Sequence, residues 1–411
     1  MSSKTAHFAR VLPAAVFLLV TLACSGSPFA PPETPASRLA KEQAAAPPQG
    51  AEAFSVERAW AHLVALSDLG PRPSQSDANR EAFEYIRSRL EELDVEVIDI
   101  EYTAPIAQGA ESDEAATGEK VLMHHLTARI PGESPDSIML AAHFDTYDRS
   151  TGANEGASGP AVLLELARQL VERPLPYTVE LLFLDGDMGY YGEEPEQPLY
   201  EASRMMVGYL GQANTLDVVR LAVVYGQVGD ADLTISRDLH SSRFDRETFF
   251  DVAEELGFGE SFPRDRGYVE TQAGHRAFLS AGMPRIVLLH DPWYGGDEMP
   301  GEYYGGEHDV RDHCAPQSLH TVGTVSLSAL RVVAARLEKI DRLSGRAARR
   351  KAEASERAEL ISEPVEEPIM AEEEAAGEPV DVLFDVLDAE PEPGPDGAES
   401  DPGGPDSELA P

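Results

Sequence analysis

The chain has 411 residues, enough for two or three domains of ordinary size, and 42% of them are hydrophobic. It carries 33 Lys and Arg against 73 Asp and Glu, a formal net charge of -40. That balance argues against binding to nucleic acid, which depends on clustered Lys and Arg, and against docking on an anionic membrane through basic patches. Only two cysteines are present, so a disulfide-stapled scaffold and a cysteine-rich zinc module are excluded.

Residues 1–24 have the pattern of an export signal. An apolar run from Val11 to Ala23 follows two basic residues and is too short to span a bilayer. The run ends at Cys24 in a context that resembles a bacterial lipoprotein cleavage site, and ordinary secretion with cleavage nearby is the alternative. We therefore expect an exported protein, either periplasmic or held at the membrane only by a lipid on Cys24. Residues 25–53, rich in Ala and Pro, predict a flexible tether.

The C-terminal part, residues 343–411, predicts a charged helix followed by a disordered acidic tail. Residues 351–411 contain 20 acidic and 2 basic side chains, and this composition provides too little apolar surface to offset the entropy of ordering. One apolar island, residues 380–388, interrupts the tail. It is either a motif that docks on a partner protein or a chance cluster in a solvated tail.

Residues 54–342 predict one α/β domain. Strands and helices alternate, which indicates a mixed, mainly parallel sheet covered on both faces, with functional loops at the carboxyl ends of the strands. The turn at residues 131–134 predicts a hairpin between the second and third strands. Helices are predicted at residues 55–66, 79–93, 160–172, 199–210, 246–256 and 317–337. Strands are predicted at residues 95–102, 122–130, 137–142, 178–184, 218–225 and 285–289.

Five motifs that carry polar side chains follow these strands or begin helices. His143 lies at the end of the third strand, and Asp145 follows two residues later. The two are either a metal ligand and the carboxylate that orients it, or a pair with a purely structural role. Glu155 lies in a glycine-rich turn, where it is either a site carboxylate or a side chain favoured by the helix dipole. The other three motifs are Asp187-Met188 after the fourth strand and residues 273–284 and 307–319.

In this order and spacing the five motifs resemble the zinc aminopeptidases of metallopeptidase family 28, nearest the bacterial glutaminyl-peptide cyclotransferase-like branch. The resemblance covers residues 54–337 and includes the turn Gly70-Pro71-Arg72-Pro73. It implies a three-layer zinc-exopeptidase fold of the phosphorylase/hydrolase-like type. It also implies a zinc cofactor and a peptide or protein N-terminus as substrate, either hydrolysed or cyclised.

The resemblance also assigns roles to individual residues. It implies that His143, Glu155 and His308 bind the metal and that Asp187 is the general base, one methylene shorter than the usual Glu. It places Asp145 and Asp312 behind these ligands, where they would orient them.

Three further positions depart from the family pattern. Met188 and Gly226 stand where carboxylate ligands are expected, and Gly274 stands where an Asp usually precedes the His of the fourth motif. Zinc prefers imidazole, thiolate and carboxylate, and catalytic zinc normally keeps three protein ligands, so about one zinc per chain is expected at most. The acidic residues that could replace the missing ligands are Glu193, Glu194, Glu307, Asp309 and Asp312.

Two functions therefore stay open. The first is an exported zinc enzyme that acts at peptide N-termini, as an aminopeptidase or a glutaminyl cyclase, with a degraded metal site; the loss of a carboxylate at Gly226 favours the one-metal cyclase arrangement. The second is a catalytically inactive relative that binds peptide or a partner protein. Cys314 is either a thiol nucleophile or a buried core residue, and the aromatic loops 293–296 and 303–306 either line a pocket or lie at the surface.

Overall fold

The computed structural model describes residues 53–105, 120–188, 200–212, 215–283, 285–346, 348–350 and 352. The leader with Cys24, almost all of the tether, the two carboxylates Glu193 and Glu194, and the segment 380–388 lie outside the described residues. What the sequence predicts for them stays a prediction.

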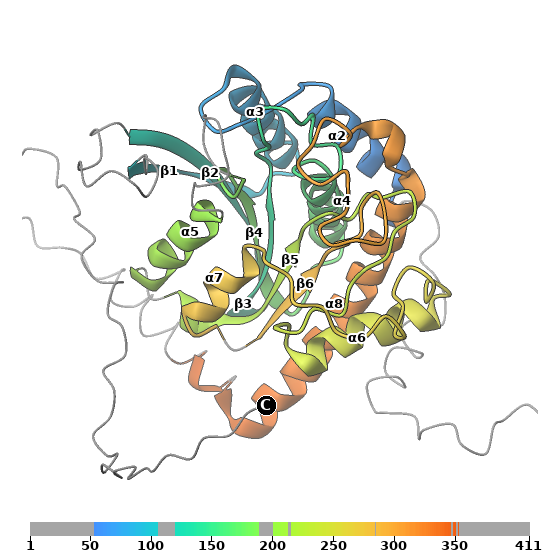
Figure 1. Ribbon diagram of the computed structural model, residues 1–411. Coiled ribbons are helices and arrows are strands. Elements are labelled where there is room, and N and C mark those ends of the chain that lie inside the picture. The colour runs from blue at the N-terminus through green and yellow to red at the C-terminus, as the bar shows by residue number, and fades with distance from the viewer. Residues whose placement is uncertain are drawn as a thin grey trace, which may run out of the picture. The chain divides into compact units, whose positions relative to one another are not determined.

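A six-stranded sheet with the order β1-β2-β4-β3-β5-β6 lies at the centre of the described region (Figure 1). The strands are β1 (Glu96–Pro105), β2 (Lys120–Ile130), β3 (Ser134–His143), β4 (Tyr177–Leu184), β5 (Val219–Tyr225) and β6 (Ile286–Leu289). The pairs β1/β2 and β2/β4 are antiparallel, whereas β4/β3, β3/β5 and β5/β6 are parallel. The predicted mixed, mainly parallel sheet is therefore confirmed.

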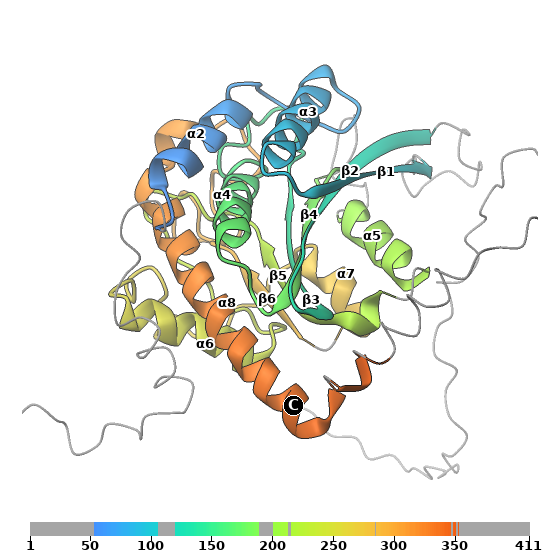
Figure 2. The same cartoon turned by 180° about the vertical axis from the view of Figure 1, so that it is seen from behind.

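Helices cover both faces of this sheet, as Figures 1 and 2 show from opposite sides. One hydrophobic cluster joins one face to α2 (Val56–Ser67), α3 (Asp77–Glu91), α4 (Ser158–Glu172), α6 (Arg243–Glu255) and α8 (Pro316–Ser344). A smaller cluster joins the other face to α5 (Glu201–Gln212) and α7 (His275–Ser280). Among the described residues, α8 alone is long and apolar enough to cross a membrane, but most of it is buried in the larger cluster.

The alternation of side chains along β3 builds both clusters at once. Leu140 and its neighbours two residues away point into the larger cluster, whereas Met139 and Ala141 point into the smaller one. Successive side chains of a strand face opposite sides of the sheet, so a strand with helices on both faces is apolar at every position. This explains why the residues before His143 form a continuous apolar run. His143 itself lies at the carboxyl end of β3.

The predicted hairpin between β2 and β3 is wrong. β4 lies between them, and it pairs with β2 on one side and with β3 on the other. The turn must therefore cross two strand spacings, roughly 9.5 Å, rather than one. Gly132 in this turn packs so closely on β4 that a Cβ would overlap the Tyr177 backbone. The Pro-Gly signal is thus explained by a close approach to β4 and not by a hairpin reversal.

Candidate functional site

A cleft of about 300 Å³ lies where β3, β4, β5 and β6 end, which is where α/β folds place their ligands. We call it the sheet-end cleft. Apolar side chains such as Leu184, Val224 and Leu288 form part of its lining, and Met299 and Pro300 contribute from a later loop. Polar side chains also line it, among them those of His143, Glu155, Asp187, Gln227, Thr271 and His290.

His143 and Glu155 meet at one end of this cleft. The Nε2 atom of His143 lies 2.7 Å from Oε1 of Glu155, and its Nδ1 atom lies 3.2 Å from the carbonyl oxygen of Asp145. Burial alone would lower the pKa of His143, but the hydrogen bonds to Asp145 and Glu155 outweigh burial and raise the pKa well above its ordinary value. The structure therefore brings together three of the residues that the resemblance singled out, with His143 as a cation between two carboxylates.

The turn that carries Glu155 is held by Asp309. Its carboxylate, fully buried, accepts hydrogen bonds from the backbone N–H groups of Asn154 at 2.7 Å and Glu155 at 3.0 Å. Burial raises the pKa of Asp309 to about 6, and these backbone donors oppose the rise. Asp309, which the sequence suggested only as a possible replacement metal ligand, thus acts as a positioning residue for Glu155.

Asp187 lines the cleft and is bound on both oxygens by one residue of α5. Ser203 donates its backbone N–H to Oδ1 at 2.8 Å and its hydroxyl to Oδ2 at 2.7 Å. Burial raises the pKa of Asp187 to about 6, while the nearby His143 charge lowers it. The carboxylate of Asp145 fixes the same segment, because it accepts the N–H groups of Asp187 and Met188. Met188 itself is buried and does not line the cleft.

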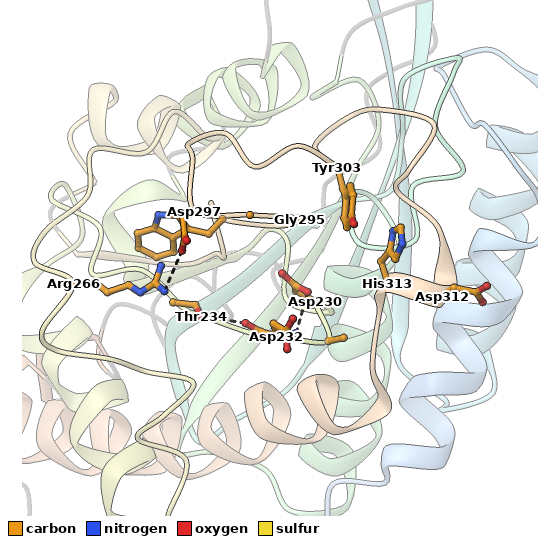
Figure 3. A pocket seen from close by; sticks show the side chains of 12 residues that line it. Asp230, Asp232, Thr234, Arg266, Gly295, Asp297, Tyr303, Asp312 and His313 are labelled. Atoms are coloured by element: carbon orange, nitrogen blue, oxygen red, sulfur yellow. Dashed lines mark hydrogen bonds and ion pairs between the residues drawn. The ribbon is translucent and has the colours of Figure 1, made fainter.

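His308 and Asp312 do not join this group. Both are exposed, and neither lines the sheet-end cleft. Asp312 instead lines a second cavity of about 440 Å³, together with Asp230 and Tyr303, as Figure 3 shows. The ring centroid of His308 lies 5.9 Å from that of Tyr303. The predicted orienting role of Asp312 is therefore not supported.

The zinc site implied by the resemblance does not fit the described residues. No group of three or more His, Cys, Asp or Glu side chains in the described part of the chain is arranged to hold a metal ion. The predicted set of His143, Glu155 and His308 is therefore not assembled, since only the first two meet. At Gly226, where a carboxylate was expected, a Cβ would overlap the ring of His290 at Nδ1. The place of the missing ligand is thus filled by another side chain.

Three side chains that the sequence did not single out also line the cleft. His290 follows β6 directly and Gln227 follows Gly226 after β5, so their places just past strand ends were the available signal. Thr271 precedes the fourth motif by two residues and carried no signal. The amide nitrogen of Gln227, the hydroxyl of Thr271 and Oε2 of Glu155 are buried and have no hydrogen-bond partner among the described residues. Burial lowers the pKa of His290 to about 4, so its ring is neutral near pH 7.

The two aromatic loops line cavities, as one of the two interpretations predicted. Tyr304 lines the sheet-end cleft, whereas Trp293 and Tyr303 line the second cavity. The ring of Tyr303 stacks on His313 with centroids 4.1 Å apart. Cys314 is buried, and burial raises the pKa of its thiol, which favours the core interpretation because a nucleophile needs an accessible thiolate.

Solved structures share this fold. A glutaminyl cyclase from an Acidobacteriales bacterium is 23% identical, with a TM-score of 0.61 over 71% of this chain and 99% of that one. A Zn-dependent exopeptidase from Parabacteroides distasonis is 18% identical, with a TM-score of 0.59 over 68% of this chain and 98% of that one. At these identities the likeness establishes the fold, and the predicted three-layer zinc-exopeptidase fold is confirmed.

Comparison with a family model identifies the family. The putative endoplasmic reticulum metallopeptidase 1 of Schizosaccharomyces pombe is 27% identical in an alignment over 188 residues that covers 41% of this chain and 22% of that protein. The match thus spans about a fifth of the length of that relative. The model of peptidase family M28 matches residues 125–330, half of the chain, including every strand from β3 to β6. The chain belongs to peptidase family M28.

Proposed function

We propose that this peptidase-like protein binds the amino-terminal residue of a peptide in the sheet-end cleft. The observation that carries the proposal is that Glu155 lines the cleft while its Oε2 atom is buried and has no partner among the described residues. An unsatisfied buried carboxylate oxygen is costly, and a charged N–H donor relieves that cost. An α-ammonium group brings three such donors and a positive charge.

The charge and size of the cleft support this ligand. His143 is cationic, but it lies between the carboxylates of Asp145 and Glu155, and Asp187 adds a further acidic group. The surroundings therefore favour a cation over an anion. At about 300 Å³ the cleft is at the small end of ligand sites, which suits one terminal residue better than a long segment. Its apolar lining, which includes Leu184 and Val224, favours an uncharged side chain.

The test is calorimetric titration of the full chain with the tripeptide Leu-Ala-Ala and with its N-acetylated form. We expect the free tripeptide to bind and the acetylated form to bind at least about tenfold more weakly, because a hydrogen bond to a charged group contributes about 1.5–3 kcal/mol. Glu155→Gln should weaken binding by a similar factor, while Glu302→Gln, an exposed matched control, should not. Equal binding of both peptides would overturn the proposal.

A second candidate is cyclisation of an amino-terminal glutamine, and Asp187 favours it. Its carboxyl lines the cleft and has a pKa of about 6, close to the range that suits proton transfer. The α-amine would attack the side-chain amide carbon, and Asp187 would take the proton from that nitrogen and return it to the departing ammonia. Because Ser203 donates hydrogen bonds to both oxygens of Asp187, the Ser203 hydroxyl must rotate away before Asp187 can accept the proton.

This candidate predicts a product. The full chain incubated with Gln-Ala-Ala should release ammonia, measured by a coupled assay and by the mass of the peptide, and Asp187→Asn should abolish the release. A peptide that binds through Glu155 but stays unchanged would leave binding, and not cyclisation, as the function.

A further inference from the structure

The packing around Gly226 and Gly274 bears on how the cleft holds its ligand. A Cβ at Gly226 would overlap the His290 ring, and a Cβ at Gly274 would overlap the Ser203 hydroxyl and lie 2.7 Å from Oδ2 of Asp187. Both glycines stand where the family pattern has a carboxylate. The side chains of His290 and Ser203 occupy the space that those carboxylates would need. The cleft is therefore closely packed at both glycines and leaves no room for the missing metal ligands.

The hydrogen bond of His290 fixes which of its ring nitrogens carries the proton. The backbone N–H of Gln227 donates to Nδ1 at 3.2 Å, so Nδ1 is unprotonated and Nε2 carries the hydrogen. A histidine that binds a metal through Nε2 needs its proton on Nδ1, which would set two N–H groups against each other here. His290, which lines the cleft, is therefore held as a hydrogen-bond donor and not as a metal ligand.

Two further donors accompany it. Gln227 and Thr271 line the cleft. The amide nitrogen of Gln227 and the hydroxyl of Thr271 are buried and lack a partner in the part of the chain that the structure describes. Gln227 is 1% exposed and Thr271 is 6% exposed, so solvent does not satisfy them. Leaving a buried donor unsatisfied is unfavourable, and native proteins rarely do so without a ligand or ordered water. Three neutral donors in one cleft point to an oxygen acceptor on the ligand.

We propose that His290, Gln227 and Thr271 bind the first carbonyl oxygen of a ligand whose α-ammonium group is held by Glu155, and that this binding needs no metal ion. The inference rests on the proposed function and specifies the ligand class as an aminoacyl amide, either a peptide or an amino-acid amide. The donors are neutral and the acidic side chains of Glu155 and Asp187 line the same cleft, so an uncharged amide carbonyl is favoured over the carboxylate of a free amino acid.

The test uses leucinamide, leucine and N-acetyl-leucinamide, titrated calorimetrically into the full chain with and without EDTA. We expect leucinamide to bind equally well in both buffers and to bind more tightly than leucine. Thr271→Val should weaken leucinamide about fivefold, the size of one neutral hydrogen bond. Thr324→Val is the matched control, because its hydroxyl also has no partner among the described residues but lies on α8 and does not line the cleft. Thermal melts of both variants exclude misfolding as the cause.

The outcomes separate the two proposals. If no α-amino compound binds, or if blocking the amine has no effect, the proposed function itself fails. If leucinamide binds through Glu155 but EDTA abolishes binding and zinc restores it, the peptide function stands and the metal-independent mode is overturned. Unchanged affinity in Thr271→Val and Gln227→Leu, or tighter binding of leucine than of leucinamide, would overturn the assignment of the carbonyl donors.

Discussion

Arg72 links the N-terminal helices to the turn that presents Glu155. Its side chain is fully buried and donates to the carbonyl oxygens of Phe144 at 3.2 Å and Gly152 at 3.1 Å, in addition to three further carbonyls. Burial lowers its pKa to about 10, which still leaves it charged at neutral pH. The planar guanidinium suits this task because its five donors point in fixed directions.

The first prediction concerns this side chain. Arg72→Met should lower the free energy of unfolding by about 3–5 kcal/mol, because it removes a buried cation and leaves several carbonyls unsatisfied. Urea denaturation of the full chain measures this. Arg80→Met is the control: Arg80 is exposed and pairs only at the surface with Asp77, so a change within about 0.5 kcal/mol is expected. Equal losses in the two variants would show that Arg72 has no special structural role.

In the segment Glu307-His308-Asp309 the sequence predicted the right loop but the wrong side chain, one position away. The sequence places this segment at the site, and the structure agrees, but it is Asp309 that reaches the turn of Glu155 while His308 stays exposed. A pattern in the sequence locates a loop without stating which of its side chains turns inward. That choice depends on the buried backbone N–H groups that need an acceptor.

At the scale of elements, a cluster of ion pairs joins the segment that follows α8 to the start of β3. Asp136 is 1% exposed and accepts from Arg346 at 2.7 Å, Arg350 at 2.9 Å and Arg220 at 3.3 Å. Helix α8 ends at Ser344, and Gly345 follows in the left-handed conformation, which turns the chain toward Asp136.

The second prediction follows from this cluster. Asp136→Asn should reduce the free energy of unfolding by about 1–3 kcal/mol, less than for a fully buried pair because the arginines are partly exposed. It should also increase amide hydrogen exchange in residues 345–352. Asp99→Asn serves as the control, since Asp99 forms a surface pair with Arg87 at 2.9 Å and should change stability little. Unaltered exchange beyond Ser344 in Asp136→Asn would contradict the fastening role.

At the scale of the whole molecule, buried carboxyl groups couple stability to pH. Burial raises the pKa of Asp185 to about 7 and that of Asp291 to about 7. In the unfolded chain an Asp has a pKa near 3.9, so between about pH 4 and pH 7 the folded protein binds more protons than the unfolded one. These two groups therefore lower stability as pH rises through this window. Burial also raises the pKa of Asp187 and Asp309 to about 6, which adds to the fall, whereas it lowers the pKa of His62, His125 and His290 to about 4, which opposes it.

The third prediction is therefore a higher melting temperature at pH 5 than at pH 8. Asp291→Asn should lower stability at every pH, because each oxygen of Asp291 accepts a backbone N–H and an amide group replaces only one of these acceptors. Between pH 4 and pH 7 the stability of the Asp291→Asn variant should nevertheless fall less than the stability of the unaltered chain. Asp297→Asn, at an exposed position nearby, should leave the pH dependence unchanged. A pH dependence in Asp291→Asn equal to that of the unaltered chain would disprove the role of this carboxyl.

The order of elements was predictable because it depends on local patterns. The strands and most helices lie within a few residues of their predicted bounds, and capping residues such as Ser76, which accepts from the Asn79 backbone, mark the starts. The short helix α7 was not expected, since six residues are too few to show a period. The insertion of β4 between β2 and β3 was missed for a different reason: strand pairing joins segments far apart in the chain.

The sequence by itself determined the family, the alternation of strands and helices, and the placement of His143 and Glu155 at the candidate site. Each of these depends on short motifs and on the local periodicity of apolar residues. Only the tertiary structure decided that His290 fills the space beside Gly226 and that Asp309, not His308, turns inward. It also decided that the amide nitrogen of Gln227 and the hydroxyl of Thr271 lack partners among the described residues. These contacts join residues from separate loops. Which side chain occupies a given volume depends on close packing across the ends of four strands, and no local pattern in the chain encodes that packing.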